Sequence, residues 1–434
     1  MEIYTVSAGQ TLADVGASAD LSAAYLQRTN QLPNPENLVP GQTVVLSPPA
    51  IVHQTMPGET LYSIAARYSV TVMQLLRNNP FLTQRILQAG DLLIITFAEQ
   101  PLRGAASLGY TYANIEPNTL RAILPYLTYL SIFTTRLSPE GTLIFPDAQN
   151  ITSLSRSFGV APLLHFSSTD ENGQFDSALA HTLLTDDALQ ESVIAQLTAA
   201  VEEQGYAGVD VDFEFLLPED GAAFVTFLAA LHQALQKNGW ILMVDLLPKW
   251  EDNQTGGAAA LDYAAIGEVA DYVFLMTYEW GYAAGPPMAV APLPQVKEVL
   301  SYATNLIDPK KILMGLPWYG YRWPIPYEAG MTKGVSLSLN EAIKDAALHD
   351  AGISFDLRSQ TPYYTYRTDG DAFYQVWFDD AQSMWLKLRQ VANEGLYGFG
   401  IWNITRPWPQ GFFLINQTYV VLRTPLPSTP SLRQ

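Results

Sequence analysis

The sequence predicts an α/β protein in which a large (β/α)8 barrel follows two small modules. Three observations support this prediction. The first hundred residues contain an internal repeat, and from residue 105 onward short apolar runs alternate with long amphipathic segments. The chain also has 434 residues, more than one hydrophobic core usually organises.

Two copies of one motif lie 49 residues apart near the N-terminus. The matching pairs are Gly9 and Gly58, Thr11 and Thr60, Leu12 and Leu61, Leu26 and Leu75, and Asn30 and Asn79. Each copy reads as strand, two short helices and strand, which predicts βααβ modules at residues 2–48 and 51–97 and a linker at 98–104. Because units of this size have little core, we expect the pair to be arranged like beads on a string.

The repeat resembles the LysM module. Residues 6–12 read Val-Ser-Ala-Gly-Gln-Thr-Leu, residues 26–30 read Leu-x-x-x-Asn, and residues 40–42 read Pro-Gly-Gln. The second copy departs at Thr55, which replaces the opening Val, and at Ala89, which replaces the Pro. The resemblance implies binding of glycans that contain N-acetylglucosamine, namely peptidoglycan or chitin. The alternative is a structural repeat without a ligand.

The remainder, residues 105–434, is expected to form the barrel domain. Its eight predicted strands are residues 106–112, 130–133, 162–167, 208–215, 241–247, 271–278, 312–319 and 396–403. Helical patterns include residues 178–204, 221–237, 294–306 and 379–394. The longest gap between strands contains Pro, Gly and Tyr in irregular order, so we expect an insertion near residues 322–370.

Composition excludes several function classes. The formal net charge of −19 makes binding to nucleic acid or to anionic lipid unfavourable, and the absence of cysteine excludes thiolate nucleophiles and thiolate metal sites. The N-terminus has no apolar run of signal-peptide length, and no segment approaches ~18 consecutive apolar residues, so we expect a soluble protein without an export signal. The aromatic content of 12% suits a carbohydrate ligand.

The fourth predicted strand carries the chemistry. Asp210, Asp212 and Glu214 alternate with Val and Phe, so on a strand the three carboxylates point to one face, the barrel interior. Crowded buried carboxylates raise one another's pKa, and Glu214, nearest the C-terminal end, is the natural proton donor. A solvated polar layer or a divalent cation site are alternatives. We expect no metal, because no His or second acidic cluster at a strand end obviously completes a coordination sphere, and no cofactor.

This run resembles the DxxDxDxE signature of glycoside hydrolase family 18, chitinase-like (β/α)8 TIM barrels that act on β-1,4 N-acetylglucosamine linkages. Met276 and Tyr278 are similar to the family's Met-x-Tyr motif, and Trp402 stands where the family places the floor of the −1 sugar site. The outermost Asp of the signature is replaced by Ala207, which leaves open how the charge of Asp210 is compensated.

The resemblance implies a retaining, substrate-assisted mechanism, in which the 2-acetamido oxygen of the −1 sugar attacks its own anomeric carbon. Glu214 would protonate the glycosidic oxygen and then activate water. Asp212 would accept from the acetamido N–H, Tyr278 would orient the acetamido oxygen, and Asp210 would tune Asp212. No second acid could be placed across a cleft as an enzyme nucleophile.

Other residues have two readings each. Trp402 is expected to stack on sugar. Tyr110, Trp318, Tyr319 and Arg322 are candidate subsite walls that could equally be packing residues. His165 is expected to be a hydrogen-bonded structural histidine. The remaining set, which could be a cleft edge or a simple hairpin, is Tyr363, Tyr364 and Tyr366.

With both repeats and the run Glu279-Trp280-Gly281-Tyr282, the chain resembles spore cortex-lytic N-acetylglucosaminidases. The resemblance implies an endo-acting enzyme on spore cortex peptidoglycan, located in the coat or cortex region of a spore-forming bacterium and made in the mother cell. We expect a monomer with no nucleic-acid or membrane partner. The alternatives are a chitinase or another hydrolase of N-acetylglucosamine polymers, and a non-catalytic wall-binding coat protein.

Overall fold

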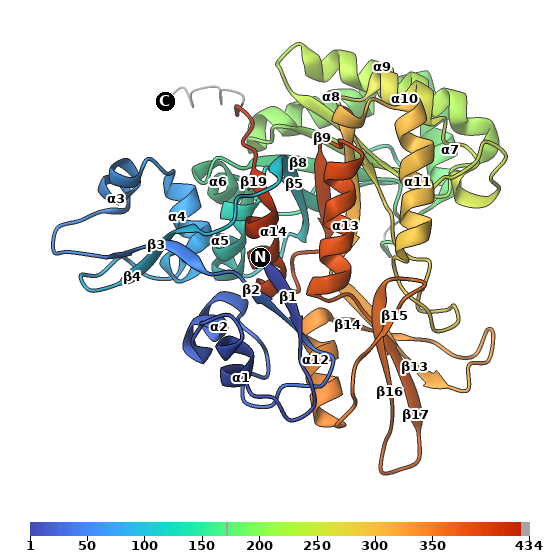
Figure 1. Ribbon diagram of the computed structural model, residues 1–434. Helices are drawn as coiled ribbons and strands as arrows, with labels where there is room; N and C mark the ends of the chain where they lie inside the picture. The colour runs from blue at the N-terminus through green and yellow to red at the C-terminus, as the bar shows by residue number, and fades with distance from the viewer. Residues whose placement is uncertain (171, 427–434) are drawn as a thin grey trace.

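The computed structural model describes residues 1–170 and 172–426, so residues 427–434 of the expected barrel domain lie outside the described residues. Eight parallel strands close a barrel, because the first also pairs with the second (Figure 1). In barrel order they are β5 (Arg103–Tyr112), β6 (Tyr129–Leu137), β8 (Ala161–Ser167), β9 (Gly208–Asp212), β10 (Ile241–Leu246), β11 (Tyr272–Leu275), β12 (Ile312–Pro317) and β18 (Gly398–Trp402). The predicted (β/α)8 barrel is confirmed.

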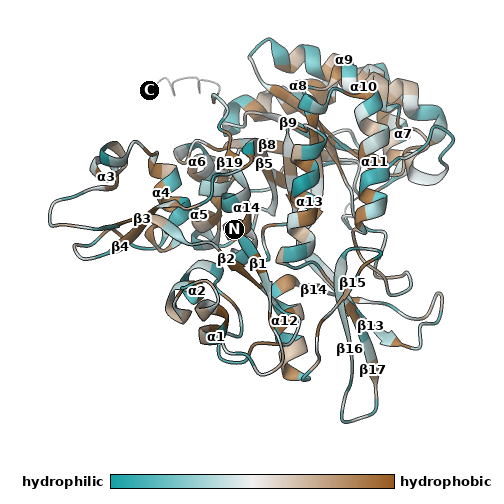
Figure 2. Ribbon diagram, in the orientation of Figure 1, coloured by the Kyte–Doolittle hydropathy of each residue, from teal (hydrophilic) through white to brown (hydrophobic). Residues whose placement is uncertain are grey.

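Apolar residues make the barrel strands the most hydrophobic part of the fold (Figure 2). The prediction was wrong at the end of the fourth strand, which stops at Asp212 and not at Phe215. Phe215 adopts a left-handed backbone with φ of 56°, and the Ser177 hydroxyl donates to its carbonyl at 2.6 Å. The chain therefore leaves the sheet as soon as it has delivered Asp212. The sixth strand also ends early, at Leu275.

Helices surround the barrel. They are α5 (Pro117–Ile123), α6 (Gln149–Ser157), α7 (Ser177–Thr185), α8 (Asp187–Gln204), α9 (Gly221–Gln236), α10 (Tyr263–Val269), α11 (Leu293–Leu306), α13 (Ala381–Asn393) and α14 (Pro409–Thr418). The single helix expected over 178–204 is two helices. Asp186 has extended backbone and its side chain accepts the amide of Leu189, so it ends α7 and caps α8.

The insertion is an antiparallel sheet that projects from the barrel at the lower right of Figure 1. Its strands are β13 (Tyr319–Ile325), β14 (Val335–Ser338), β15 (Ser354–Asp356), β16 (Thr361–Arg367) and β17 (Phe373–Trp377), with α12 (Leu339–Leu348) between β14 and β15. The tyrosines at 363, 364 and 366 belong to β16 of this sheet. Tyr364 is buried and donates to Asp345 at 2.8 Å, which is a packing role.

Each N-terminal repeat is a βααβ module. The first contains β1 (Glu2–Thr5), α1 (Leu12–Ala17), α2 (Ala23–Asn30) and β2 (Thr43–Leu46), and the second contains β3 (Pro49–Gln54), α3 (Leu61–Tyr68), α4 (Val72–Asn78), the short helix η1 (Pro80–Thr83) and β4 (Leu92–Phe97). The repeated asparagine explains the shared pattern. Asn30 bonds to both backbone groups of Val45, and Asn79 does the same with Ile94, so each fastens its second helix to its last strand.

The modules dock on the barrel, so the expected beads-on-a-string arrangement is wrong. Helix α14 contacts both α2 and α4. The Gln410 amide donates to Asn30 at 3.0 Å, and the Asn416 amide donates to Asn78 at 2.8 Å. Separation of the domains would break these hydrogen bonds and would also expose Val45, Ile94 and Phe97, which belong to one hydrophobic cluster with barrel residues. The size of a module does not predict the docking, because the barrel surface that the module contacts lies far away in the sequence.

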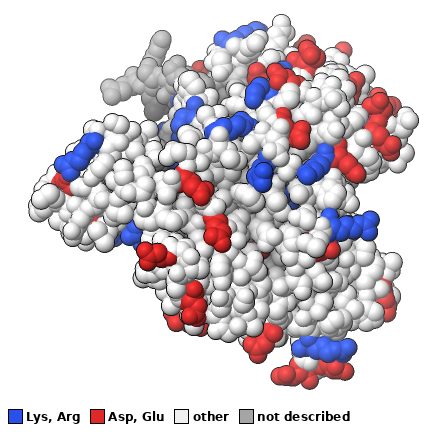
Figure 3. Space-filling view, in the orientation of Figure 1, with Lys and Arg blue, Asp and Glu red and all other residues white. Residues whose placement is uncertain are grey.

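The charged side chains are sparse on the face shown in Figure 3, where acidic groups gather most densely at the upper right. Among the described residues, no helix is long and apolar enough to cross a membrane.

Candidate active site

Three neighbouring strands, β8, β9 and β10, bring a polar cluster into the barrel interior. In the parallel register, His165 of β8 and Met243 of β10 both pair with Asp210 of β9, and Ser167 pairs with Asp212. Paired residues of parallel strands point to the same face, so alternation along β10 aims Asp245, two residues after Met243, at the level of Asp212. Side chains from the adjacent strands therefore point into the barrel beside the acids that were predicted to point inward.

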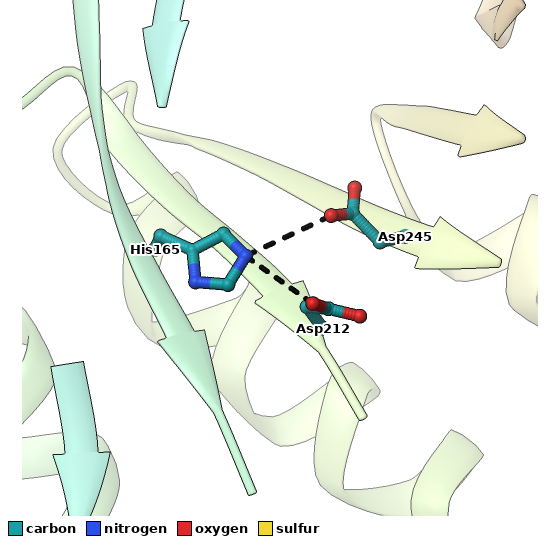
Figure 4. Close-up of side chains that lie close together, drawn as sticks. All are labelled: His165, Asp212 and Asp245. Carbon is teal, nitrogen blue, oxygen red and sulfur yellow. Dashed lines mark ion pairs between the residues drawn. The ribbon is translucent and has the colours of Figure 1, made fainter. Parts of the chain in front are cut away.

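His165 lies at the centre of this cluster (Figure 4). Its Nε2 is 3.5 Å from Asp212 Oδ2 and 3.8 Å from Asp245 Oδ2, and its Nδ1 is 2.7 Å from the hydroxyl of Thr134. Burial alone would lower the pKa of His165, but the two carboxylates outweigh burial and raise it to about 10. The imidazole is therefore a cation at neutral pH. It is hydrogen-bonded as expected, and it also compensates the charge of Asp212.

Asp210 is fully buried, and its charge is compensated without the missing Asp of the signature. Ser131 of β6 donates to Asp210 Oδ2 at 2.5 Å. Burial has the largest effect and raises the pKa of Asp210, while the interactions with His165, Ser131 and Asp245 lower it. Burial and the charge of Asp210 raise the pKa of Asp245 well above its usual value. Ala207 itself is buried in the hydrophobic core.

Glu214 lies just beyond the end of β9 and is half-buried. Burial raises its pKa to about 9, and the charges of Asp212 and Glu279 add to the increase. Glu214 is therefore protonated at neutral pH, as a general acid must be. Phe213, between the two acids, faces the other way and stacks on Phe224 at 5.6 Å. The alternation predicted from sequence thus places the acids inward and the ring in the core.

A cleft of about 660 Å³ opens at the C-terminal ends of the strands. Its walls come from the segments that follow β5, β11, β12 and β18, and they include Tyr112, Glu279, Tyr319, Trp402 and Arg406. In a barrel of this kind the loops at this face hold the substrate. The cleft is adjacent to the polar cluster, because the charge of Glu279 reaches Glu214.

Trp402 ends β18 and lines the cleft, where its ring packs against Tyr110, Phe133 and Tyr112. Tyr278 follows β11 and is buried. Burial, together with the charges of the acid cluster, raises the pKa of Tyr278 well above its usual value, so its hydroxyl keeps its proton. Met276 is buried beside it, and its amide donates to Leu246 at 3.0 Å.

The other candidate subsite residues lie in different places. Tyr110 is buried beneath Trp402 and donates to Asp245 Oδ1 at 2.6 Å, so it belongs to the polar cluster. Tyr319 lines the cleft and donates to Glu279 at 2.5 Å. Trp318 is almost fully buried at the base of the cleft wall, where its ring centroid lies 4.4 Å from that of Phe412. Arg322 points into the insertion sheet, where it pairs with Asp345 at 3.1 Å.

A candidate cation site exists where none was apparent from the sequence. One ligand atom each from His165, Asp212 and Asp245 lie within 4.8 Å of one another. The expectation that no His or second acid meets the strand-four carboxylates is therefore wrong, since both come from adjacent strands. The two carboxylates raise the pKa of His165, so a cation would have to displace the proton from its imidazole in order to bind there. The absence of a metal stays a prediction.

Residues 94–406 match the family model described as glycosyl hydrolases family 18, and residues 4–47 and 53–96 match the LysM domain. The chain belongs to glycosyl hydrolase family 18. Residues 4–47 and 53–96 lie in two LysM domains. Like other members of family 18, the chain is a glycosidase with a TIM barrel. The chain covers 99% of the length of two relatives.

One relative is the cortical fragment-lytic enzyme of Bacillus subtilis (strain 168), which is 32% identical and covers 98% of this chain and 99% of its own. The putative sporulation-specific glycosylase YdhD of the same bacterium is 29% identical over 97% of this chain and 99% of its own. Among solved structures, the Bacillus cereus spore cortex-lytic enzyme SleL has a TM-score of 0.82 at 31% identity, over 97% of this chain and 98% of that one.

Sequence reasoning missed Ser131, Asp245 and Glu279 as parts of the site. Asp245 had a visible signal, because it is a lone acid within the apolar run Leu242-Met243-Val244 to Leu246-Leu247. Glu279 directly follows Tyr278 and carried a weaker signal. Ser131 had none, since small hydroxyl residues are common in strands. Glu279 is a second carboxylate in the cleft, which the sequence analysis did not place there.

Replacement of Glu279 by Gln is expected to keep most activity and to shift its pH dependence. The charge of Glu279 raises the pKa of Glu214, so removal of that charge lowers this pKa. The fall in kcat/KM at alkaline pH, which we expect near pH 9 in the wild type, then moves to lower pH. The pH profile of kcat/KM checks this. Loss of all activity would identify Glu279 as the nucleophile, whereas an unshifted profile would mean that Glu279 does not influence Glu214.

Proposed function

We propose that this glycosidase cleaves β-1,4 linkages after N-acetylglucosamine in spore cortex peptidoglycan, by a retaining and substrate-assisted mechanism. One arrangement carries the proposal. The proton donor, Glu214, lies beside the carboxylate of Asp212, and the Nε2 atom of the His165 cation lies 3.5 Å from Asp212 Oδ2. The relatives named for cortex lysis support the substrate.

The first step needs a protonated acid and a nucleophile. Glu214 supplies the proton, because its pKa of about 9 keeps it neutral until the leaving oxygen takes the proton. The acetamido oxygen of the bound sugar is the nucleophile, and its tether to the reacting ring supplies proximity. Glu279 is a poor nucleophile, since Tyr319 and Tyr321 both donate to its Oε1 and burial raises its pKa.

Asp212 stabilises the charge that develops on the acetamido group. Its Oδ1 is buried and has no hydrogen-bond partner among the described residues, so it is free to accept the acetamido N–H. Tyr278 keeps its hydroxyl proton and can donate it to the acetamido oxygen. After the leaving group departs, ionised Glu214 accepts a proton from the water that opens the oxazolinium intermediate.

The polar cluster below the cleft supports Asp212. Tyr110 donates to Asp245, Ser131 donates to Asp210, and His165 takes the positive charge. Trp402 forms the apolar floor on which the sugar ring stacks. The two LysM domains bind the wall glycan. We place the enzyme at the spore, since the relatives act on the spore cortex.

Product analysis tests the substrate. Peptide-bearing cortex fragments, intact cortex and chitin oligomers are digested in parallel, and the products are identified by mass spectrometry. We expect fragments with N-acetylglucosamine at the new reducing end from cortex material. Cleavage of chitin oligomers alone would overturn the proposed substrate and leave a chitinase. Reducing-end muramic acid would overturn the proposed linkage.

A further inference from the structure

A second cavity, of about 540 Å³, lies where both LysM modules meet the barrel. Its walls are the ends of α2 and α4, the start of η1, one side of α5, and α14. The modules contribute equivalent positions, 49 residues apart. These pairs are Arg28 and Arg77, Thr29 and Asn78, and Gln31 and Pro80. Equivalent residues of the two modules thus line the same cavity.

The walls of the cavity are held in place by hydrogen bonds between domains. Arg77 Nε donates to Asn416 at 3.1 Å, and its NH1 donates to the carbonyl of Pro125 at 3.2 Å. The Tyr126 hydroxyl donates to the carbonyl of Arg77 at 2.8 Å. Because these contacts already fix the wall, little conformational entropy is lost when a ligand binds.

The cavity lies next to the active-site cleft. Thr119 of α5 lines both. On the opposite wall, Arg406 lines the cleft and the next residue, Pro407, lines the cavity. A polymer that leaves the cleft on the side of β5 and β18 would therefore pass next to the space between the modules.

The chemistry of the lining differs from that of the whole chain. The formal net charge of the protein is −19, yet the cavity is lined by two arginines and by no carboxylate among the described residues. The rest is largely apolar and includes the rings of Phe81, Phe412 and Phe413. Rings suit the flat faces of sugars, and arginine suits carboxylates.

We propose that this cavity is a distal binding site for the same glycan strand that occupies the cleft, and that it selects strands bearing carboxylates. The occupant is peptidoglycan with its acidic lactyl or peptide groups, in preference to uncharged N-acetylglucosamine polymers. This inference rests on the proposed function and deepens it, because it assigns a basis for the choice of peptidoglycan over chitin.

The test measures binding, in protein made inactive by Glu214→Gln, so that cleavage is not required. The ligands are peptide-bearing cortex fragments and N-acetylglucosamine oligomers of equal length. Arg28→Gln is expected to weaken binding of the cortex fragments about three- to ten-fold and that of the oligomers by a smaller factor. Ala122→Trp, which fills the cavity from α5, is expected to weaken binding of both ligands.

Arg389→Gln is the matched control, since Arg389 is an exposed arginine on α13 and lines no part of the cavity. It should bind both ligands like the parent. Parent-like binding of cortex fragments by both Arg28→Gln and Ala122→Trp would overturn the distal site. Equal weakening of both ligands by Arg28→Gln would overturn the selection by charge. A wild type that binds fragments but does not cleave them would overturn the proposed function alone.

Discussion

Glu214→Gln is expected to reduce glycan cleavage by ~10²–10⁴-fold while binding to insoluble peptidoglycan stays unchanged. The amide has the size of the acid but cannot give a proton to the leaving oxygen or accept one from water. The LysM modules are far from this side chain in the sequence and keep their contacts with the barrel. Steady-state rates on cortex fragments and co-sedimentation with insoluble wall measure the two effects.

Glu219→Gln provides the control for this substitution. Glu219 is an exposed acid in the short helix after β9, and it lies five positions after Glu214. Its replacement removes one negative charge from the same region and should leave turnover unchanged. Near-normal turnover by Glu214→Gln would contradict the assignment of the proton donor.

His165→Leu is expected to lower both stability and activity. Removal of one partner from a buried group of charges costs ~3–5 kcal/mol, because the remaining carboxylates lose their compensating cation. Asp212 then loses the cation that lies beside it and is held less well to stabilise positive charge, so we expect a fall in kcat of ~10²–10³-fold. Urea unfolding and steady-state rates at neutral pH measure the two effects.

The pH dependence of stability provides a further check on His165. Its pKa in the folded state, about 10, lies above the unfolded value, so its contribution is complete below pH ~6.5 and is lost as the pH rises through about 10. The Leu variant lacks this contribution, so the difference in stability between the wild type and the variant should be largest below pH ~6.5 and should shrink as the pH rises toward 10. A gap that is independent of pH would mean that His165 contributes by packing alone.

His232→Leu is the control for a histidine beside an aspartate at the surface. His232 is partly exposed, and its Nε2 lies 3.3 Å from Asp271. A solvated pair of this kind contributes at most ~1 kcal/mol. A loss of stability at His232 as large as that at His165 would show that burial of the cluster is not the cause.

The parts of the site that follow one strand could be predicted from the sequence. The period of two along a strand is enough to aim Asp210 and Asp212 inward, whereas Glu214 lies beyond the end of β9 and its position does not follow from that period. The eight apolar runs were enough to indicate the barrel. The end of β9 was misjudged, because the left-handed turn at Phe215 is occupied by a residue that normally favours strands.

The parts that depend on register between strands could not be predicted. His165 and Asp245 reach Asp212 only because β8 and β10 flank β9 at a particular stagger, and one sequence does not specify that stagger. For Tyr110 a subsite wall and a packing role were both open, and the side chain lies below the cleft, bonded to Asp245. The docking of the modules depends on polar residues of α14, which look like any helix surface in the sequence.

The configuration of the newly formed reducing end tests the central claim, substrate-assisted cleavage at N-acetylglucosamine, most directly. Proton NMR during the first turnovers on cortex fragments distinguishes the two anomers before they interconvert. Retention predicts the β-anomer of N-acetylglucosamine as the first product, because the acetamido oxygen and then water attack opposite faces of the anomeric carbon. Initial appearance of the α-anomer would contradict the account, since it would require water to displace the leaving group in a single step.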